Sequence, residues 1–160
     1  MVIALRRNSS ARGYDFVLSG QSKVIRTTLK LETSKLRETI ELTGKVREFV
    51  GSSDVKNGLL SCFSRHTTVA LVLANRRQGI SKLVPEVLHA TLEGAVKDKA
   101  MTIPSEPETV SAYLLSTVLG SSVMIPVEGG KCALGDWQGL YFIEMSGPRE
   151  REVVMTLVGV

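Results

Sequence analysis

Apolar and polar side chains alternate along residues 24–31, which read VIRTTLKL. This period of two residues predicts a β-strand with one buried face. A second strand is predicted over 59–64, after the turn dipeptide Asn57-Gly58. Residues 69–74 read VALVLA and are apolar on both faces, so we expect a central strand there. Four more strand-like runs follow near the end of the chain: 121–127, 131–135, 139–145 and 152–158, with a turn at Gly129-Gly130.

Two other segments carry the longer period of about 3.6 residues that is typical of an amphipathic helix. In the first, Val46, Phe49 and Val50 share one face, and Thr43 is the expected N-cap. The second covers about 80–96, and its periodicity places His89 on the solvent side. That histidine is therefore interpreted as a surface residue.

A third helix is predicted over 105–119, where the start and stop signals are good. Ser105 and Glu108 suit a capping box, and Gly120 suits the C′ position just past the helix. The residues expected on its buried face are Val110, Tyr113, Leu114, Thr117 and Val118.

The order of these elements predicts an α+β fold. The links between the late strands are too short for crossovers, so neighbouring strands must run antiparallel. We expect a largely antiparallel curled sheet or sandwich with two to three helices packed on it. Residues 1–22 have poor periodicity and look like an N-terminal extension, whereas 23–160 form a single domain.

The composition changes this picture little. Of the 160 residues, 43% are hydrophobic, and no apolar run approaches the roughly 18 residues of a membrane span. The start of the chain lacks the order and length of a secretory signal, so we expect no membrane association and a cytoplasmic location. Cys62 and Cys132 lie in apolar segments and are interpreted as buried structural thiols.

The net charge of +4 raises nucleic-acid binding as a hypothesis. Residues 1–50 carry ten basic side chains against five acids, and the rest of the chain carries ten against eleven. The excess thus lies partly in the N-terminal extension, and no basic patch is interleaved with aromatic residues. Nucleic acid is therefore not the expected partner.

Three segments carry a resemblance to a known family: SRHTTVALVLAN at 64–75, LLSTVLGSSVMIPVEGGKCALGDWQGLYFIE at 114–144, and GPRERE at 147–152. Together, and in this order, they resemble the YjbQ family over about residues 23–160. The resemblance implies a YjbQ-like fold and a homotrimer with sites near the subunit boundaries. It also implies a weak, secondary thiamine-phosphate synthase activity, and a metal ion at a cluster of histidines.

The chain departs from the family pattern where that cluster should be. Arg76 and Arg77 stand close to Asn75, where the family usually has acids, and Tyr113 stands where a histidine is usual. Of the cluster only His66 remains, and one imidazole does not supply the three ligands of a catalytic zinc site. We therefore predict no metal and no other cofactor, and expect the arginines to make the pocket prefer anions.

His66 is the candidate catalytic residue, because an imidazole with an ordinary pKa near 6.5 suits acid–base work. The structural alternative for His66-Thr67-Thr68 is that these polar side chains form hydrogen bonds to backbone groups in a turn that leads into the strand. Trp137 is a packing anchor or a pocket wall, and Arg149 is an anion ligand or a partner of a neighbouring glutamate. The candidate ligand-binding residues are Thr67, Thr68, Asn75, Tyr113, Trp137, Gln138 and Arg149.

Three functional hypotheses remain open at this point, of which a nucleic-acid binder that uses the basic N-terminal half is the least favoured. In the first, the protein is a divergent family member whose inter-subunit pocket binds a phosphorylated small molecule, with or without weak transferase activity. In the second, it is a catalytically inactive trimeric relative with a binding or structural role. The sequence does not decide whether the protein is an enzyme.

Overall fold

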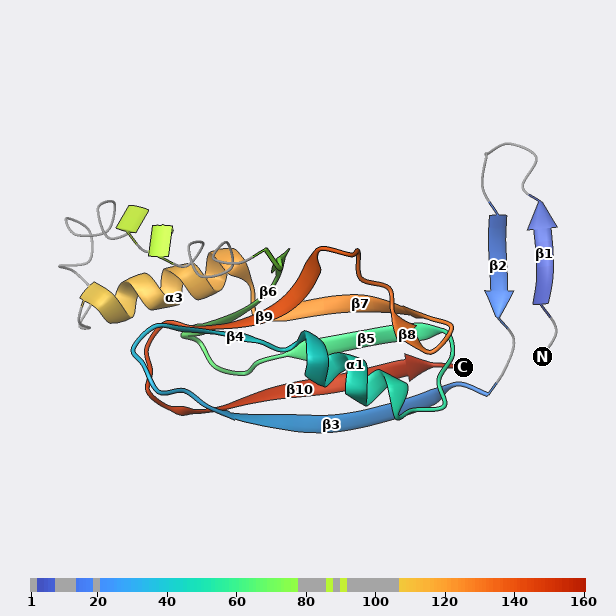
Figure 1. The fold of residues 1–160 in the computed structure, drawn as a ribbon, viewed down its shortest axis with the longest axis horizontal. Helices are drawn as coiled ribbons and strands as arrows, with labels where there is room; N and C mark the ends of the chain where they lie inside the picture. The colour runs from blue at the N-terminus through green and yellow to red at the C-terminus, as the bar shows by residue number, and fades with distance from the viewer. Residues whose placement is uncertain (1–2, 8–13, 19–20, 78–85, 88–89, 92–106) are drawn as a thin grey trace.

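The computed structural model of the chain describes residues 3–7, 14–18, 21–77, 86–87, 90–91 and 107–160. Its main elements are strands β1 (Ile3–Arg7), β2 (Tyr14–Leu18), β3 (Lys23–Glu32), β4 (Glu38–Glu41), β5 (Gly58–Phe63), β6 (Val69–Asn75), β7 (Ser122–Glu128), β8 (Lys131–Cys132), β9 (Gln138–Glu144) and β10 (Glu150–Gly159), and helices α1 (Thr43–Gly51) and α3 (Pro107–Leu119). Figure 1 shows their arrangement.

The strands form two main sheets, and every pairing in them is antiparallel. One sheet has five strands in the order β3-β10-β5-β7-β8, and the other has three in the order β4-β9-β6. The predicted α+β fold with a curled antiparallel sheet is confirmed. The predicted strands at 24–31, 59–64 and 69–74 and the four late strands correspond to β3, β5, β6, β7, β8, β9 and β10.

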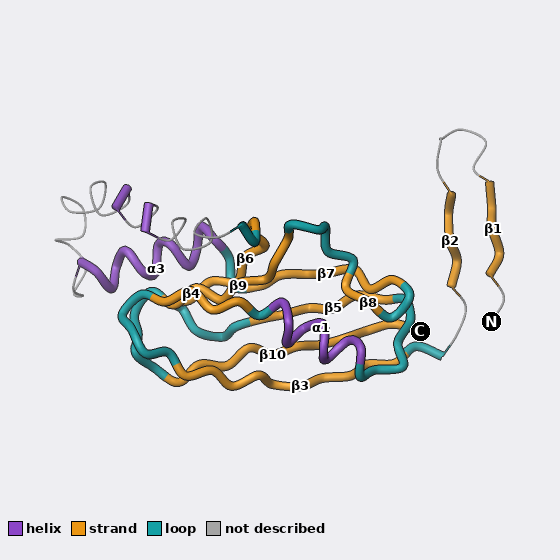
Figure 2. The backbone as a smooth tube through the Cα atoms, in the orientation of Figure 1, coloured by secondary structure: helices purple, strands orange, loops and turns teal. Residues whose placement is uncertain are grey.

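The core lies between the two sheets, and α1 covers it from one side (Figure 2). On β10, residues 151, 153, 155 and 157 alternate inward, and the opposite register positions on β3 and β5 supply their neighbours. The fully buried side chains of the core include Leu60, Leu71, Ile125, Phe142 and Leu157. Burial of one face of each strand thus explains the period of two that the sequence displays.

The N-cap of helix α1 lies one residue earlier than expected. Leu42 occupies the N-cap position and makes no side-chain cap bond, so the prediction that Thr43 is the N-cap was wrong. Thr43 is buried in the first turn, and its hydroxyl accepts a hydrogen bond from the backbone N–H of Leu140 at 3.0 Å. The hydroxyl therefore fixes the helix to β9 instead of capping it, while Val46 and Val50 fill the core as expected.

Helix α3 is confirmed, and Gly120 ends it with a positive φ of 90°. Of the five residues predicted on its buried face, Val110 is buried, but Tyr113, Leu114, Thr117 and Val118 are exposed. Small side chains let the helix approach β6 closely, and the hydroxyl of Ser116 donates to the carbonyl oxygen of Val69 at 2.7 Å. The residues that pack there are Ala70, Ala112, Leu115, Ile143 and Met145. No helix within the described residues is long and apolar enough to cross a membrane.

Of the two predicted turns, one is confirmed. Gly129 and Gly130 have φ values of 57° and 78° and join β7 to β8 in a two-residue hairpin. Asn57-Gly58 forms no such turn, because Asn57 and Val160 exchange backbone hydrogen bonds and Gly58 already pairs with Gly159. Gly58 is needed for close approach instead, since a Cβ there would overlap the carbonyl oxygen of Val158.

The prediction that 69–74 form a central strand was wrong. Strand β6 lies at the edge of the three-stranded sheet, and β9 is the central strand. The inner half of β6 is buried on both faces because α3 covers it, which gives the continuous apolar run. Strand β4 was not predicted.

The N-terminal segment contains a two-stranded sheet of β1 and β2, which its weak periodicity did not indicate. Most of the predicted helix over 80–96, including His89, lies outside the described residues, as does the expected capping box at Ser105. Both cysteines are free thiols. Burial raises the pKa of the Cys62 thiol to about 12, so it is protonated and inert at neutral pH.

The glycines predict a contrasting pair of stability changes. Gly58→Ala is expected to lower the free energy of unfolding by about 1–3 kcal/mol because the added methyl group meets the β10 backbone. Gly44→Ala in α1, where nothing lies within 4 Å of the new methyl group, is expected to raise it by up to about 1 kcal/mol. Urea unfolding of both variants measures this difference, and equal effects would contradict it.

Candidate functional site

The segment 64–68, which joins β5 to β6, is fixed by backbone hydrogen bonds to the end of α3. The N–H of Ser64 donates to the carbonyl oxygen of Ser121 at 2.9 Å, and the N–H of Leu71 donates to that of Gly120 at 3.0 Å. The turn after α3 therefore holds the start of this segment and the beginning of β6, which follows it. His66 lies in the middle of the segment and is half-buried.

The imidazole of His66 reaches across to β10. The backbone N–H of Glu152 donates a hydrogen bond to Nε2 of His66 at 3.1 Å. Burial lowers the pKa of His66 below its ordinary value, and the positive charge of Arg151 lowers it further against the weaker opposite effects of Glu144 and Glu152. His66 is therefore neutral at neutral pH.

Close to His66 lies a buried ion pair between the two main sheets. Arg151 on β10 donates from Nε and Nη2 to the two carboxylate oxygens of Glu144 on β9, at 2.6 and 2.7 Å. Both side chains are almost completely buried, at 6% and 0% exposure. This two-pronged contact is the strong geometry for a guanidinium and a carboxylate.

Three further groups donate hydrogen bonds to the carboxylate of Glu144. The backbone N–H groups of Met145 and Ser146 donate to Oε1, and the Thr33 hydroxyl donates to Oε2. Burial alone would raise the pKa of Glu144, but the hydrogen bonds from Arg151 and Ser146, the charge of Arg151 and the Thr33 hydroxyl together lower it. The carboxylate is thus ionised. Arg151 also donates from Nη2 to the hydroxyl of Thr68 at 2.9 Å, next to His66.

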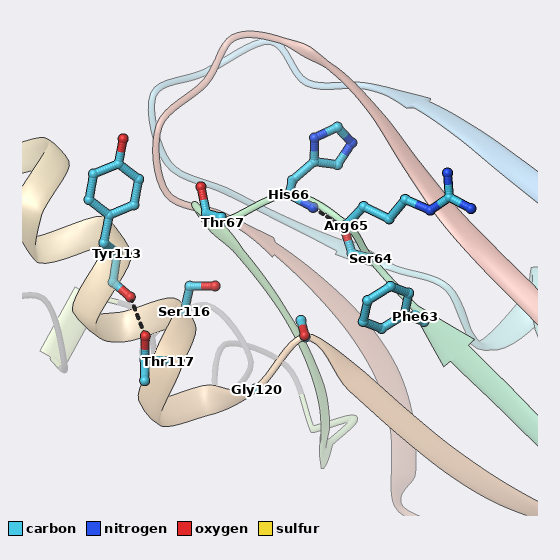
Figure 3. Close-up of a pocket in the computed structure, with 10 residues that line it drawn as sticks. Phe63, Ser64, Arg65, His66, Thr67, Tyr113, Ser116, Thr117 and Gly120 are labelled. Atoms are coloured by element: carbon cyan, nitrogen blue, oxygen red, sulfur yellow. Dashed lines mark hydrogen bonds between the residues drawn. The ribbon is translucent and has the colours of Figure 1, made fainter.

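A groove runs between α3 and the segment 64–68, and Figure 3 shows one part of it. The Tyr113 ring from α3 and the His66 imidazole flank the Thr67 hydroxyl, while the Arg65 side chain extends away from Tyr113. An adjoining pocket reaches from there to Arg149. Its described lining residues are Arg65, His66, Thr67, Thr68, Thr109, Tyr113, Ser146, Arg149 and Arg151. None of these is acidic.

His66 also borders a second hollow on the β3 side, where the charge balance differs. Glu32, Glu150 and Glu152 line that side together with Lys30 and Arg151. Glu32 and Glu150 lie directly opposite each other in the β3–β10 register. His66 therefore separates a groove of hydroxyls and guanidinium groups from a hollow rich in carboxylates.

The structure brings five of the eight predicted site residues together. His66, Thr67, Thr68, Tyr113 and Arg149 all line the pocket next to α3. Nε of Arg149 donates to the carbonyl oxygen of Ser146 at 2.9 Å, and its terminal nitrogens have no hydrogen-bond partner among the described residues.

The other three predicted residues lie elsewhere. Asn75, Trp137 and Gln138 sit at the far end of β6 and β9, a strand length of roughly 20 Å from His66. There the Arg77 guanidinium lies 5.1 Å from the Trp137 ring centroid, and Arg76 pairs with Glu41. Within one chain, these arginines therefore do not form the rim of the His66 pocket, which we had expected from their sequence position.

Sequence reasoning missed Glu144 and Arg151. Arg151 shares the inward phase of Val153, Met155 and Leu157 on β10, and this alternation was an available signal for a buried charge. Glu144 is the last residue of β9, which is buried on both faces. The sequence of this strand therefore does not alternate, and it gave no signal that the Glu144 side chain points inward.

The described residues do not fit the metal ion that the family resemblance implies. In the parts of the chain that the structure describes, no three His, Cys, Asp or Glu side chains gather closely enough to hold one. Nε2 of His66 is already the acceptor for a backbone N–H, and the Arg151 charge lies nearby. The absence of a cofactor nevertheless stays a prediction.

Comparisons with known proteins agree on the family. The model of the "UPF0047 protein YjbQ-like" family matches residues 27–160. A UPF0047 protein of Archaeoglobus fulgidus is 37% identical over 127 residues, which cover 79% of this chain and 96% of the relative. One from Methanothermobacter thermautotrophicus is 33% identical over 132 residues, covering 82% and 90%.

Solved structures give the same result for the fold. A YbjQ-like protein of unknown function from Sulfolobus solfataricus superposes with a TM-score of 0.78 at 28% identity, covering 88% of this chain and 100% of that one. A hypothetical protein from Aeropyrum pernix superposes with a TM-score of 0.75 at 29% identity, covering 85% and 99%. The resemblance drawn from the sequence motifs is confirmed.

The ion pair predicts a large effect of a single substitution. Glu144→Ala leaves Arg151 charged and buried without its partner, so we expect the free energy of unfolding to fall by about 3–5 kcal/mol. Glu41→Ala is the matched control, because its pair with Arg76 is exposed and should contribute at most about 1 kcal/mol. Urea unfolding at pH 7 measures both, and similar losses would show that the buried pair has no special weight.

Proposed function

This chain belongs to the YjbQ-like UPF0047 family, and from its geometry we propose that it binds a phosphorylated small molecule in a pocket at a subunit boundary. The observation that carries the proposal is the pocket beside α3. It combines three arginines, four Ser and Thr side chains, Tyr113 and a neutral His66, with no acidic residue among the described lining. Such a set of donors suits the oxygen atoms of a phosphate group.

Arg149 is the residue best placed to hold the phosphate. Its Nε bond to Ser146 fixes the orientation of the guanidinium, and its terminal nitrogens are free of partners among the described residues. A guanidinium held in this way offers two parallel N–H donors to an anion. Arg151 also lines the pocket, but its Nε and Nη2 are engaged by Glu144 and Thr68, so Arg149 carries the main part of this role.

The groove next to this pocket suits the organic part of the ligand. It is lined by Phe63, Tyr113 and the backbone near Gly120, and it shares His66 and Thr67 with the pocket. Phe63 and Tyr113 are each about two-fifths exposed, so both rings offer apolar surface to a bound molecule. A ligand with a phosphate at one end and a flat ring at the other would occupy both parts.

A homotrimer, which the family resemblance implies, is part of the proposal. The outer face of the five-stranded sheet carries Val24, Leu59, Phe63, Met124 and Val158, all at least 40% exposed. In the register Val24, Val158 and Leu59 lie side by side on neighbouring strands. Phe63 and Met124 lie further along the same face, with Arg26, Thr156 and Ser61 between them. Because Phe63 belongs to both this face and the groove, a second copy seated here would close the groove.

A weak thiamine-phosphate synthase-like transferase activity in the same pocket is the second part of this proposal. In this step the ring nitrogen of a thiazole phosphate would attack the methylene carbon of an aminopyrimidine diphosphate, forming thiamine phosphate and releasing diphosphate. Thiamine phosphate formation that is lost in His66→Ala would establish a weak synthase-like transferase. If this protein forms no thiamine phosphate while an active relative does in the same assay, it has a binding role without catalysis, or it is a catalytically inactive trimeric relative with a structural role. A cytoplasmic location stays a prediction, with which the two free thiols agree.

Ligand binding has a direct test in thermal stability. Thiamine phosphate at millimolar concentration is expected to raise the Tm, whereas thiamine without the phosphate is not, because the arginines select the phosphate. Arg149→Ala should weaken the binding by at least about tenfold, since it removes charged hydrogen bonds to the ligand. Arg47→Ala on α1, which alters the net charge equally away from the pocket, should leave it unchanged.

If no phosphate ester stabilises the protein, the binding function is wrong, and the structural relative becomes the better hypothesis. Stabilisation that Arg47→Ala and Arg149→Ala reduce equally would instead indicate non-specific attraction by the net positive charge.

The trimer is tested separately by sedimentation velocity. Leu59→Lys places a charge beside Val158 on the exposed sheet face, so we expect this variant to sediment as a monomer while the unmodified protein sediments as a trimer. Leu36→Lys is the control, because Leu36 is similarly exposed but lies on a loop. A monomeric unmodified protein would contradict the proposed interface.

A further inference from the structure

His66 has one lone pair in its neutral form, and a backbone amide uses it. A neutral imidazole carries a proton on one ring nitrogen and a lone pair on the other. The N–H of Glu152 donates to Nε2, and a backbone amide cannot act as the acceptor in this contact. Nε2 must therefore carry the lone pair, and Nδ1 must carry the proton.

The same contact disfavours the protonated imidazolium. With a proton on Nε2, two donors would face each other across 3.1 Å. The positive charge of Arg151 nearby acts in the same direction, and burial of the ring does as well. The carboxylates of Glu144 and Glu152 oppose this, with smaller effects than burial and Arg151.

We propose that His66 is held by Glu152 as the neutral Nδ1–H tautomer and serves the pocket as a hydrogen-bond donor, not as a general base or a metal ligand. Nδ1 has no protein partner among the described residues, so it is the nitrogen left for a ligand. Its partner must be an acceptor atom, such as a phosphate or carbonyl oxygen. The ligand part of this inference rests on the proposed function, whereas the tautomer does not.

The proposal changes what His66 can contribute to chemistry. A general base needs a free lone pair directed at the substrate. In His66 the lone pair points to β10, and using it would break the bond that positions the ring. Glu152 is thus a positioning residue that acts through its backbone N–H, and its side chain is not required for this role.

The tautomer can be measured directly in the unmodified protein. Nitrogen-15 NMR of histidine-labelled protein distinguishes a protonated ring nitrogen from one with a lone pair. The chain has two histidines, and a His89→Gln variant assigns the signals that remain to His66. We expect Nδ1 protonated and Nε2 unprotonated at pH 7.5, and a titration below pH 6.5. A protonated Nε2, or a mixture of tautomers, would overturn the proposal.

Substitutions test the donor role with thiamine phosphate as the probe. Asn at position 66 can place its amide N–H near the position of Nδ1, whereas Gln extends to the position of Nε2 and leaves no donor there. His66→Asn is therefore expected to keep the affinity within about threefold, and His66→Gln and His66→Ala to lose about tenfold. Equal losses in His66→Asn and His66→Gln would overturn the donor role.

The two measurements separate this inference from the proposed function. If the unmodified protein binds no phosphate ester but His66 is the Nδ1–H tautomer, the proposed function fails and the assignment of the tautomer is supported. If it binds the ester with Nε2 protonated, the function survives and this inference fails.

Discussion

The ion pair between Glu144 and Arg151 is the interaction on which the rest of the structure depends. It joins β9 of one sheet to β10 of the other inside the protein, where an unpaired charge would be very costly. The remaining lone pairs and protons of the pair must also find partners. They find them in Thr33, Thr68 and the backbone after β9. The hydrogen bonds that this one buried pair needs thus fix the positions of the segments that carry Thr33, Thr68 and the residues after β9.

The position of the candidate site follows from this arrangement. Thr68 contacts Arg151. His66, two residues before Thr68, contacts the backbone of Glu152, one residue beyond Arg151. The loop before β10 is held in the same way, because the Thr33 hydroxyl accepts from the N–H of Arg149 at 2.9 Å. The groove is therefore lined by groups whose places are set by a structural charge pair, which itself does not need to contact a ligand.

The sequence predicted those parts of the fold in which burial is one-sided. Strands β3 and β10 alternate because one face meets the core, and the Gly129-Gly130 turn needs two positive φ values. Prediction failed where tertiary contacts override periodicity. Helix α3 buries Ala112 and Ser116 and leaves Leu114 and Val118 outside, because its closest neighbour is a strand backbone. For the site, sequence proximity explains His66 with Thr68, but pairing of Arg151 with Glu144 depends on the register of two sheets.

The family motifs that this chain has altered do not all bear on the same pocket. Within one chain Arg76 and Arg77 lie at the far end of β6, so the missing acids there do not border the His66 groove of the same chain. Tyr113 lies on the groove wall, where the resemblance led us to expect a histidine. A hydroxyl in place of an imidazole removes a metal-ligating lone pair, and the lone pair of His66 is engaged by β10. The described groove is consequently lined by O–H and N–H donors, which recognise the oxygen atoms of an anion and offer little to a cation.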